Sequence, residues 1–538
     1  MTKSLIIDSN LAIVNQDRIF DQYWSWPISQ NQYDEPITEF IKWSDELHRD
    51  IQGVPGLLNA FFLIKSDLLK DLSFYASAWI DVAKAKQEDI KLIYGPDEFI
   101  LKSLVTDNFI GPPPTIRKRN VRGIGLAGNI KSKLSRFKRS WTNRQPLFSG
   151  QSRYYATSMN NLGKQISPRE TSFIRFYADD FRRVPEDQTE LPKDLNELAR
   201  QISDVLCKVI SKYNTAPSRA FAEYMYSIAF QYLKIGWVDA AISPMLQKIK
   251  TSSTLITGTG GGYSARLLSY QFLTSGKTVL RTTHGGDSPF FDDVLNPTIE
   301  FPFASKYIAY GEQAARALKL AVDSRSESEY PFYTRSVIAA GSDFHSKILN
   351  RAQTKKNETV RSVTVVAGCF NGAYRVNPQY TLHDVVYMEW QRRLLHMTKK
   401  LGYTVISKRH PKGIMSQTQI FPEYADNELL NTTMADVDQH TDAYIFDFQG
   451  SAFMEAICTL KPVVLIDIPM RTLRYEARSQ ISESISIVPA SFNEQNRVVI
   501  DEKQLEHALT NPVDVSAREQ LIHDYLLRPS DNSNLIYA

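Results

Sequence analysis

Short apolar segments alternate with helix-like segments in the second half of the chain, and most of the apolar segments end at a glycine. The first group of such segments comprises Thr254–Thr257, Val279–Thr283, Tyr307–Tyr310 and Val337–Ala340. Parallel sheets produce this alternation because the chain needs a crossover, usually a helix, between neighbouring parallel strands. The pattern therefore predicts a parallel α/β domain that reaches its last strand shortly before residue 345.

The same pattern restarts after a polar connection at residues 346–361. The strands expected in this second group are Val363–Ala367, Tyr403–Ser407, Tyr444–Phe446, Val463–Asp467 and Ile485–Val488, with a long helix over Leu382–Leu401 between the first two. We therefore predict a second doubly wound domain over residues 362–505, followed by a helical tail.

The preceding residues show less regular patterns. Apolar positions three and four residues apart predict helices over 193–214 and 218–235. Between Arg117 and Arg144 there are ten Lys or Arg residues and no Asp or Glu. This stretch is compatible with docking on anionic lipids or polyanionic glycans, and equally with a solvated insertion. No motif that reads nucleic acid accompanies it, so nucleic acid is not an expected partner.

The amino-acid composition is that of an ordinary globular protein. The 538 residues are 43% hydrophobic and 23% charged, as in ordinary globular proteins. No apolar run approaches the roughly 18 residues that a membrane-spanning helix needs, and the first residues lack the pattern of a signal peptide. We therefore expect a cytoplasmic protein. The three cysteines are far apart and lack metal-ligand spacing, so neither structural disulfides nor a zinc site is expected.

Two motifs of the second domain follow predicted strands. The first is Lys408-Arg409-His410-Pro411, in which basic side chains surround an imidazole. The second is Gly450-Ser451 with Glu455 one turn later, at the expected start of a helix. Ligands of open α/β sheets bind at the carboxyl ends of the strands, and helix starts attract anions. The first motif therefore predicts binding of a phosphate or a carboxylate, and the second predicts binding of a phosphate. A surface loop that is merely basic and simple N-capping of the helix are the respective alternatives. Gly368 and Asn371, in the loop after this domain's first strand, are expected to face the same cleft.

Two glycine-rich loops of the first domain are the other candidates. His284-Gly285-Gly286-Asp287 follows a strand, and Asp287 is the candidate general base or nucleophile, with His284 beside it. The loop Gly258–Gly262 matches neither phosphate-binding glycine motif, so Gly260 and Gly261 are expected to approach an acceptor sugar instead. A turn containing a satisfied histidine and a structural glycine loop remain the alternatives.

The order and spacing of these motifs resemble GT-B glycosyltransferases that use cytidine-nucleotide donors. The relevant groups are the CDP-glycerol glycerophosphotransferases, the capsule Kdo transferases, and the bacterial sialyl- and polysialyltransferases. The resemblance rests on His410-Pro411, on Gly450-Ser451 with Glu455, on Lys461-Pro462-Val463-Val464, and on His284-Gly285 with Tyr310-Gly311, and it covers roughly residues 250–530.

The resemblance implies two Rossmann-like domains that face a cleft. Residues 1–345 would form the acceptor-side domain with insertions at about 110–240, residues 362–505 would hold the donor, and 506–538 would pack back on the first domain. Residues His410 and Ser451 would contact the donor phosphate. No metal is implied, because basic side chains and helix ends neutralise the leaving nucleotide, and no cofactor is implied beyond the donor.

The function expected from this resemblance is transfer of a Kdo- or sialic-acid-like sugar from its CMP form to a bacterial surface glycan. The acceptor would be an oligosaccharide or a lipid-linked glycan, with the 117–144 stretch offering peripheral contact at the inner face of the cytoplasmic membrane. CDP-glycerol or a UDP-sugar as donor, a non-catalytic glycan assembly or export protein, and a sugar-nucleotide epimerase are the alternatives.

Overall fold

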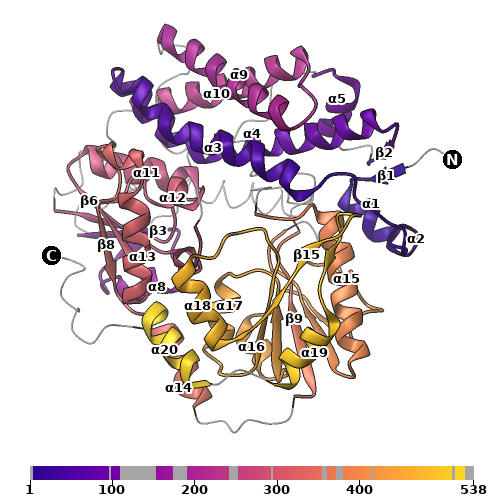
Figure 1. Ribbon diagram of the computed structural model, residues 1–538. Coiled ribbons are helices and arrows are strands. Elements are labelled where there is room, and N and C mark those ends of the chain that lie inside the picture. The colour runs from indigo at the N-terminus through magenta and orange to yellow at the C-terminus, as the bar shows by residue number, and fades with distance from the viewer. Residues whose placement is uncertain are drawn as a thin grey trace, which may run out of the picture.

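The fold is described from a computed structural model (Figure 1). The structure describes residues 4–95, 99–109, 153–173, 191–241, 252–292, 295–353, 360–370, 380–413, 416–511 and 515–527. The basic stretch 117–144 and Asn371 lie outside these residues, as does 354–359 of the predicted connection.

The first sheet is parallel throughout and has the strand order β4-β3-β5-β6-β7-β8. The strands are β3 (Tyr154–Thr157), β4 (Ser172–Phe173), β5 (Thr254–Thr257), β6 (Thr278–Thr282), β7 (Lys306–Ala309) and β8 (Ser336–Ala339). The helices of this domain are α8 (Asn161–Ile166), α11 (Tyr263–Thr274), α12 (Leu295–Glu300), α13 (Glu312–Asp323) and α14 (Asp343–Ala352). The strand order reverses between β3 and β5, which is where open α/β sheets form a crevice.

The second sheet is also parallel, with the order β11-β10-β9-β12-β13-β14. Its strands are β9 (Ser362–Val366), β10 (Thr404–Lys408), β11 (Asn427–Leu429), β12 (Ala443–Phe446), β13 (Val463–Asp467) and β14 (Ser486–Pro489). Its helices are α15 (Asp384–Lys400), α16 (Met434–Asp438), α17 (Ser451–Ile457), α18 (Tyr475–Ser484) and α19 (Glu502–Thr510). This is the doubly wound nucleotide-binding order, and it reverses between β9 and β12.

The two parallel sheets establish the predicted class, an α/β protein of GT-B type with two Rossmann-like domains. The predicted strands agree with the observed ones to within a residue or two at each end, and Val463–Asp467 matches at both ends. Part of the predicted connection at 346–361 is helical, because α14 continues to Ala352.

A layer of long helices lies above the two domains (Figure 1). It consists of α3 (Gln30–Ile51), α4 (Pro55–Gln87), α9 (Lys193–Tyr213) and α10 (Arg219–Ala241), which pack against one another. Most side chains of α4 are buried, because α3 and α10 pack against it and α11 and α12 of the first domain contact it as well. Residues 1–345 therefore contain this helical layer in addition to the first sheet.

The first thirty residues cross from the helical layer to the second domain. They form β1 (Ser4–Ile6), which pairs with β2 (Lys91–Ile93), and the short helices α1 (Ser9–Val14) and α2 (Gln16–Ile19). The hydroxyl of Ser9 donates to Asp384 at the start of α15 over 3.0 Å, and Trp26 packs on His383 with ring centroids 4.4 Å apart. The helical layer, whose α4 lies against the first domain, is thereby attached to the second domain as well.

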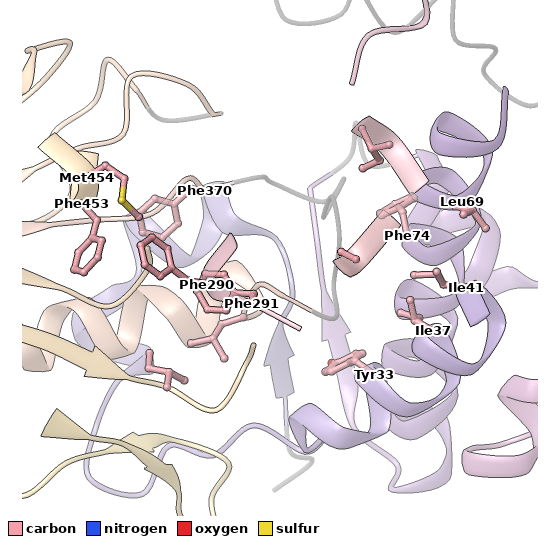
Figure 2. Close-up of a cluster of buried hydrophobic side chains, with 14 of the residues drawn as sticks. Tyr33, Ile37, Ile41, Leu69, Phe74, Phe290, Phe291, Phe370, Phe453 and Met454 are labelled. Carbon is pink, nitrogen blue, oxygen red and sulfur yellow. The ribbon is translucent and has the colours of Figure 1, made fainter. Parts of the chain in front are cut away.

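The two domains also contact each other directly. The amide of Asp292 donates to the carbonyl of Thr472 over 2.9 Å, and that of Arg474 donates to the carbonyl of Phe290 over the same distance. Phe290 and Phe291 from the first domain belong to the same buried cluster as Phe453 and Met454 from the second (Figure 2). Helix α20 (Val515–Leu526) packs against both α13 and α18, so the tail joins the two domains as well.

Candidate functional site

A cavity of about 790 Å³ lies at the carboxyl edge of the second sheet. It is lined by the last residues of β9, β10, β12 and β13, and thus includes the point where the strand order reverses. Asn161 and Phe344 of the first domain complete the lining. The cavity is therefore shared by the two domains, and its volume is that of a typical small-molecule or cofactor site.

Lys408 and His410 bring two basic side chains to the cavity from the end of β10. Burial lowers the pKa of Lys408, although the carboxyl group of Glu455 opposes the shift. Burial also lowers the pKa of His410, so the imidazole is largely neutral at pH 7 before a ligand binds. The Nδ1 atom of His410 lies 3.1 Å from the amide of Lys412, which holds the ring in place beside Pro411. A bound anion would favour the charged form of both side chains.

Gly450 and Ser451 line the same cavity at the start of α17. Strand β12 ends at Phe446, and the chain turns through Gly450, the N-cap residue, into the helix. Gly368, which follows β9, and Glu455, one turn into α17, also line the cavity. The structure therefore brings together seven of the predicted donor-site residues: Gly368, Lys408, His410, Pro411, Gly450, Ser451 and Glu455.

The structure corrects the prediction that Arg409 binds the phosphate. Its guanidinium group points away from the cavity and pairs with Glu428 over 2.9 Å, and the two side chains are 2% and 1% exposed. Lys408 and His410 line the cavity, whereas Arg409 between them does not. Glu428 also accepts the amides of Ile420 and Phe421. The role of Arg409 is therefore to anchor the segment that follows β10.

Asp447 is a cavity residue that the motif pattern did not single out. Its carboxylate accepts hydrogen bonds from the hydroxyl of Tyr387 (2.9 Å), the indole of Trp390 (2.9 Å) and the amide of Gln391 (2.5 Å). Tyr387 in turn accepts the amide of Gly368 over 2.6 Å. Burial raises the pKa of Asp447 to about 6, while these three donors favour the charged form. The network ties α15 to the ends of β9 and β12.

The loop His284–Asp287 lies at the junction between the domains and does not line the cavity. Gly285 and Gly286 have φ values of +85° and +87°, which favour glycine. A Cβ atom on Gly286 would lie 2.8 Å from the ring of Tyr310, and one on Gly285 would lie 3.8 Å from the amide of Ser451. Gly286 thus allows close packing of the loop against Tyr310, and Gly285 lies beside the start of α17.

The candidate catalytic pair of the first domain is not arranged as expected. His284 is exposed and lies outside the cavity lining. The Oδ2 atom of Asp287 forms an ion pair with Arg471 of the second domain over 3.0 Å. A general base needs a carboxylate directed at the acceptor hydroxyl. In this structure the carboxylate is directed at a guanidinium group instead.

The structure also corrects the prediction that the glycine loop after β5 approaches an acceptor sugar. A Cβ atom on Gly260 would lie 2.2 Å from the carbonyl oxygen of Ile299, and the Gly260 amide donates to Glu300 over 2.9 Å. Gly261 donates to the hydroxyl of Thr259. The close approach that Gly260 permits is therefore to the protein's own backbone, and a Cβ atom on Gly261 would lie 3.1 Å from the Thr259 hydroxyl. The acceptor-side residues that reach the cavity, Asn161 and Phe344, follow β3 and β8, and β3 was not predicted.

Glu455 gives a test of the cavity's electrostatics that needs no ligand. Burial raises its pKa to about 7, although Lys408 opposes the shift. Between the ordinary value of 4.5 and about 7, the folded protein binds more protons at this site than the unfolded chain, so the wild type loses stability as pH rises. Glutamine cannot lose a proton. We therefore expect the free energy of unfolding of Glu455→Gln, relative to that of the wild type, to rise by about 1–3 kcal/mol as the pH is raised from about 5 to about 8. Denaturant unfolding measures this difference. A difference that does not change with pH would contradict this.

The described residues contain no helix that is both long and apolar enough to cross a membrane. They also contain no group of three or more His, Cys, Asp or Glu side chains placed to hold a metal ion.

The chain has little similarity to known proteins. No protein-family model matches the chain, and no curated protein matches it. Among solved structures, a match is Phytolacca americana UGT2 complexed with UDP-2fluoro-glucose and pterostilbene. The sequence identity is 11%, the TM-score is 0.31, and the match covers 69% of this chain and 84% of that chain. A similarity of this size carries no weight for function, and the strand orders described above define the fold independently.

Proposed function

We propose that the protein is a glycosyltransferase that binds a nucleotide-linked sugar in the cavity of the second domain. The observation that supports this most is the position of the cavity, at the strand-order reversal of a doubly wound sheet and open to residues of a second such domain. Ligands of such sheets bind at this point. A cavity bounded by both domains can hold a donor on one side and an acceptor on the other.

The lining of the cavity suits the parts of such a donor. Lys408, His410 and the start of α17 at Ser451 offer positive charge and hydrogen-bond donors to a phosphate. Tyr380, Met470 and Phe448 add apolar and aromatic surface, which a nucleobase needs for stacking. Glu455, with a pKa of about 7, can exchange a proton or accept a hydrogen bond from a ribose hydroxyl near neutral pH.

Within this class, the proposed donor is a CMP-linked ulosonic acid of the Kdo or sialic-acid type. The order of His410-Pro411, Gly450-Ser451 and Lys461-Pro462 supports this choice through the family resemblance. The proposed acceptor is a bacterial surface glycan, as an oligosaccharide or on a lipid carrier. The protein would act in the cytoplasm, where residues 117–144 could contact anionic lipid at the membrane surface.

His410→Ala is expected to weaken nucleotide binding by about 10- to 100-fold, because it removes a hydrogen bond to a charged phosphate worth about 1.5–3 kcal/mol. The measurement is calorimetric binding of CMP, CDP and UDP to the full chain, followed by product analysis with each donor and a glycan acceptor. Lys412→Ala is the matched control, because Lys412 is exposed in the same loop and outside the cavity lining.

The donor panel also separates the alternatives. Preferential binding of CDP or UDP would replace the CMP proposal with the corresponding transferase. Glycan binding without turnover, unaffected by His410→Ala, would indicate a non-catalytic assembly protein. Conversion of the donor sugar without any acceptor would indicate an epimerase. If no nucleotide binds the wild type, the proposed function is wrong.

A further inference from the structure

Arg471 brings a third basic side chain to the cavity, from the side opposite Lys408. It follows β13, whereas Lys408 ends β10, and β9 and β12 lie between these two strands in the sheet. The cavity is thus bordered by positive charge on both sides of the strand-order reversal. Lys408 and His410 lie at the end of β10, and Arg471 lies at the junction with the first domain.

The first domain fixes the position of Arg471. Asp287 pairs with its Nη1 atom over 3.0 Å, and the guanidinium carbon lies 3.6 Å from the ring centroid of Phe291. The side chains of Arg471 and Asp287 are only 8% and 16% exposed. Ion pairs shielded from water in this way hold a defined geometry, and stacking on an aromatic ring orients the plane of a guanidinium group.

The geometry of the junction decides which part of a donor would reach Arg471. The amide of Ser451 lies close to Gly285, in the same short loop as Asp287. A donor phosphate at Lys408, His410 and Ser451 would therefore have its transferred sugar next to the first domain, from which the acceptor must approach. Arg471 lies on that side, held by Asp287 and Phe291. A guanidinium group pairs best with a planar carboxylate through two parallel hydrogen bonds.

We propose that Arg471 recognises a carboxylate on the sugar of the donor, and that Asp287 is a positioning residue that presents Arg471 to it. The inference rests on the proposed function and adds a determinant of substrate class to it, namely selection of acidic over neutral sugars. It also gives Asp287 a different role from the general base expected from the sequence.

The test compares matched acidic and neutral donors on the full-length protein. The probes are CMP, CMP-N-acetylneuraminic acid and the methyl ester of its carboxylate, with UDP-glucuronic acid and UDP-glucose as a second acidic and neutral pair. Calorimetry gives the affinity of each. We expect the wild type to prefer the acid, and Arg471→Gln to lose about tenfold or more in affinity for the acid while its affinity for CMP changes less than about twofold.

Two further variants keep the test independent of folding. Arg471→Lys retains the charge and the pairing with Asp287, and its melting temperature should stay near that of the wild type. It should still lose most of the preference for the acid, because an ammonium group lacks the planar fork. Asp287→Asn should reduce the acid preference without weakening CMP binding.

Two results would overturn the inference while leaving the proposed function intact. Equal weakening of CMP and of the acidic donor by Arg471→Gln would place Arg471 at the nucleotide phosphate. An unchanged ratio between acid and ester, with only a lower melting temperature, would make the pair a structural link between the domains. Failure of the wild type to bind any of the probes would instead reject the proposed function, and the inference with it.

Discussion

Replacing Asp447 by alanine is expected to lower the free energy of unfolding by about 3–5 kcal/mol and to abolish nucleotide binding. The carboxylate accepts from Tyr387, Trp390 and Gln391, and the last two side chains are completely buried. Alanine would leave three donors without an acceptor at the floor of the cavity. Each buried polar group that loses its partner costs about 1–3 kcal/mol.

The loss of binding follows from the same network. Tyr387 accepts the amide of Gly368, so the hydroxyl that orients the loop after β9 is itself oriented by Asp447. Without the carboxylate, the ends of β9 and β12 no longer share a fixed partner. Denaturant unfolding and calorimetric titration with CMP, CDP and UDP measure the two effects separately.

Asp467→Asn is the control for the stability measurement. Asp467 also ends a strand at the cavity, but its partner Arg478 is half exposed and can turn to water. We expect a change of less than about 1 kcal/mol there. A similarly small loss in Asp447→Ala would mean that the three donors find other partners, and the network would then not support the cavity.

The second domain could be predicted because the pattern of its sequence follows directly from the topology of a parallel sheet. Strands that are apolar and buried are typical of a parallel sheet, and Val463–Ile466 is such a run. Since all strands of such a sheet end at one edge, the motifs after β10 and β12 had to lie close together.

The residues that sequence reasoning missed depend on contacts between distant segments. Arg471 lies in an ordinary-looking loop, and it becomes a candidate only because the first domain places Asp287 against it. The role of Gly260 likewise depends on Ile299 and Glu300, which follow some forty residues later in the chain. Strand β3 follows an irregular basic stretch and does not end at a glycine, so the pattern that marked β5 to β8 of its sheet did not mark it. Packing between elements cannot be read from periodicity within one element.

The contacts of the helical layer also join distant segments, and one buried cluster there gives the second large expected effect on stability. Lys65 of α4 pairs with Asp45 of α3 over 2.8 Å and with Glu327 of the first domain over 2.5 Å. Arg325 pairs with the other oxygen of Glu327 over 2.7 Å. Burial alone would raise the pKa of Glu327, but the two cations beside it bring that pKa below its usual value. Two positive and two negative side chains thus form a neutral buried cluster between the layer and the domain.

Glu327→Gln is expected to lower the free energy of unfolding by about 3–5 kcal/mol, because it leaves Lys65 and Arg325 buried with only Asp45 as counter-charge. The measurement is denaturant unfolding at pH 7. Glu312→Gln is the matched control, since Glu312 pairs with Arg316 on the surface, where both side chains are more than half exposed. Removing that pair should change stability by less than about 0.5 kcal/mol.

A double replacement distinguishes the cost of an unpaired charge from that of a lost contact. Lys65→Met combined with Glu327→Gln removes one charge of each sign and leaves Asp45 paired with Arg325. We expect this variant to recover a substantial part of the stability that Glu327→Gln loses, because net charge in the cluster returns to zero. Additive losses in the double variant would show that the cluster stabilises the junction through its individual hydrogen bonds.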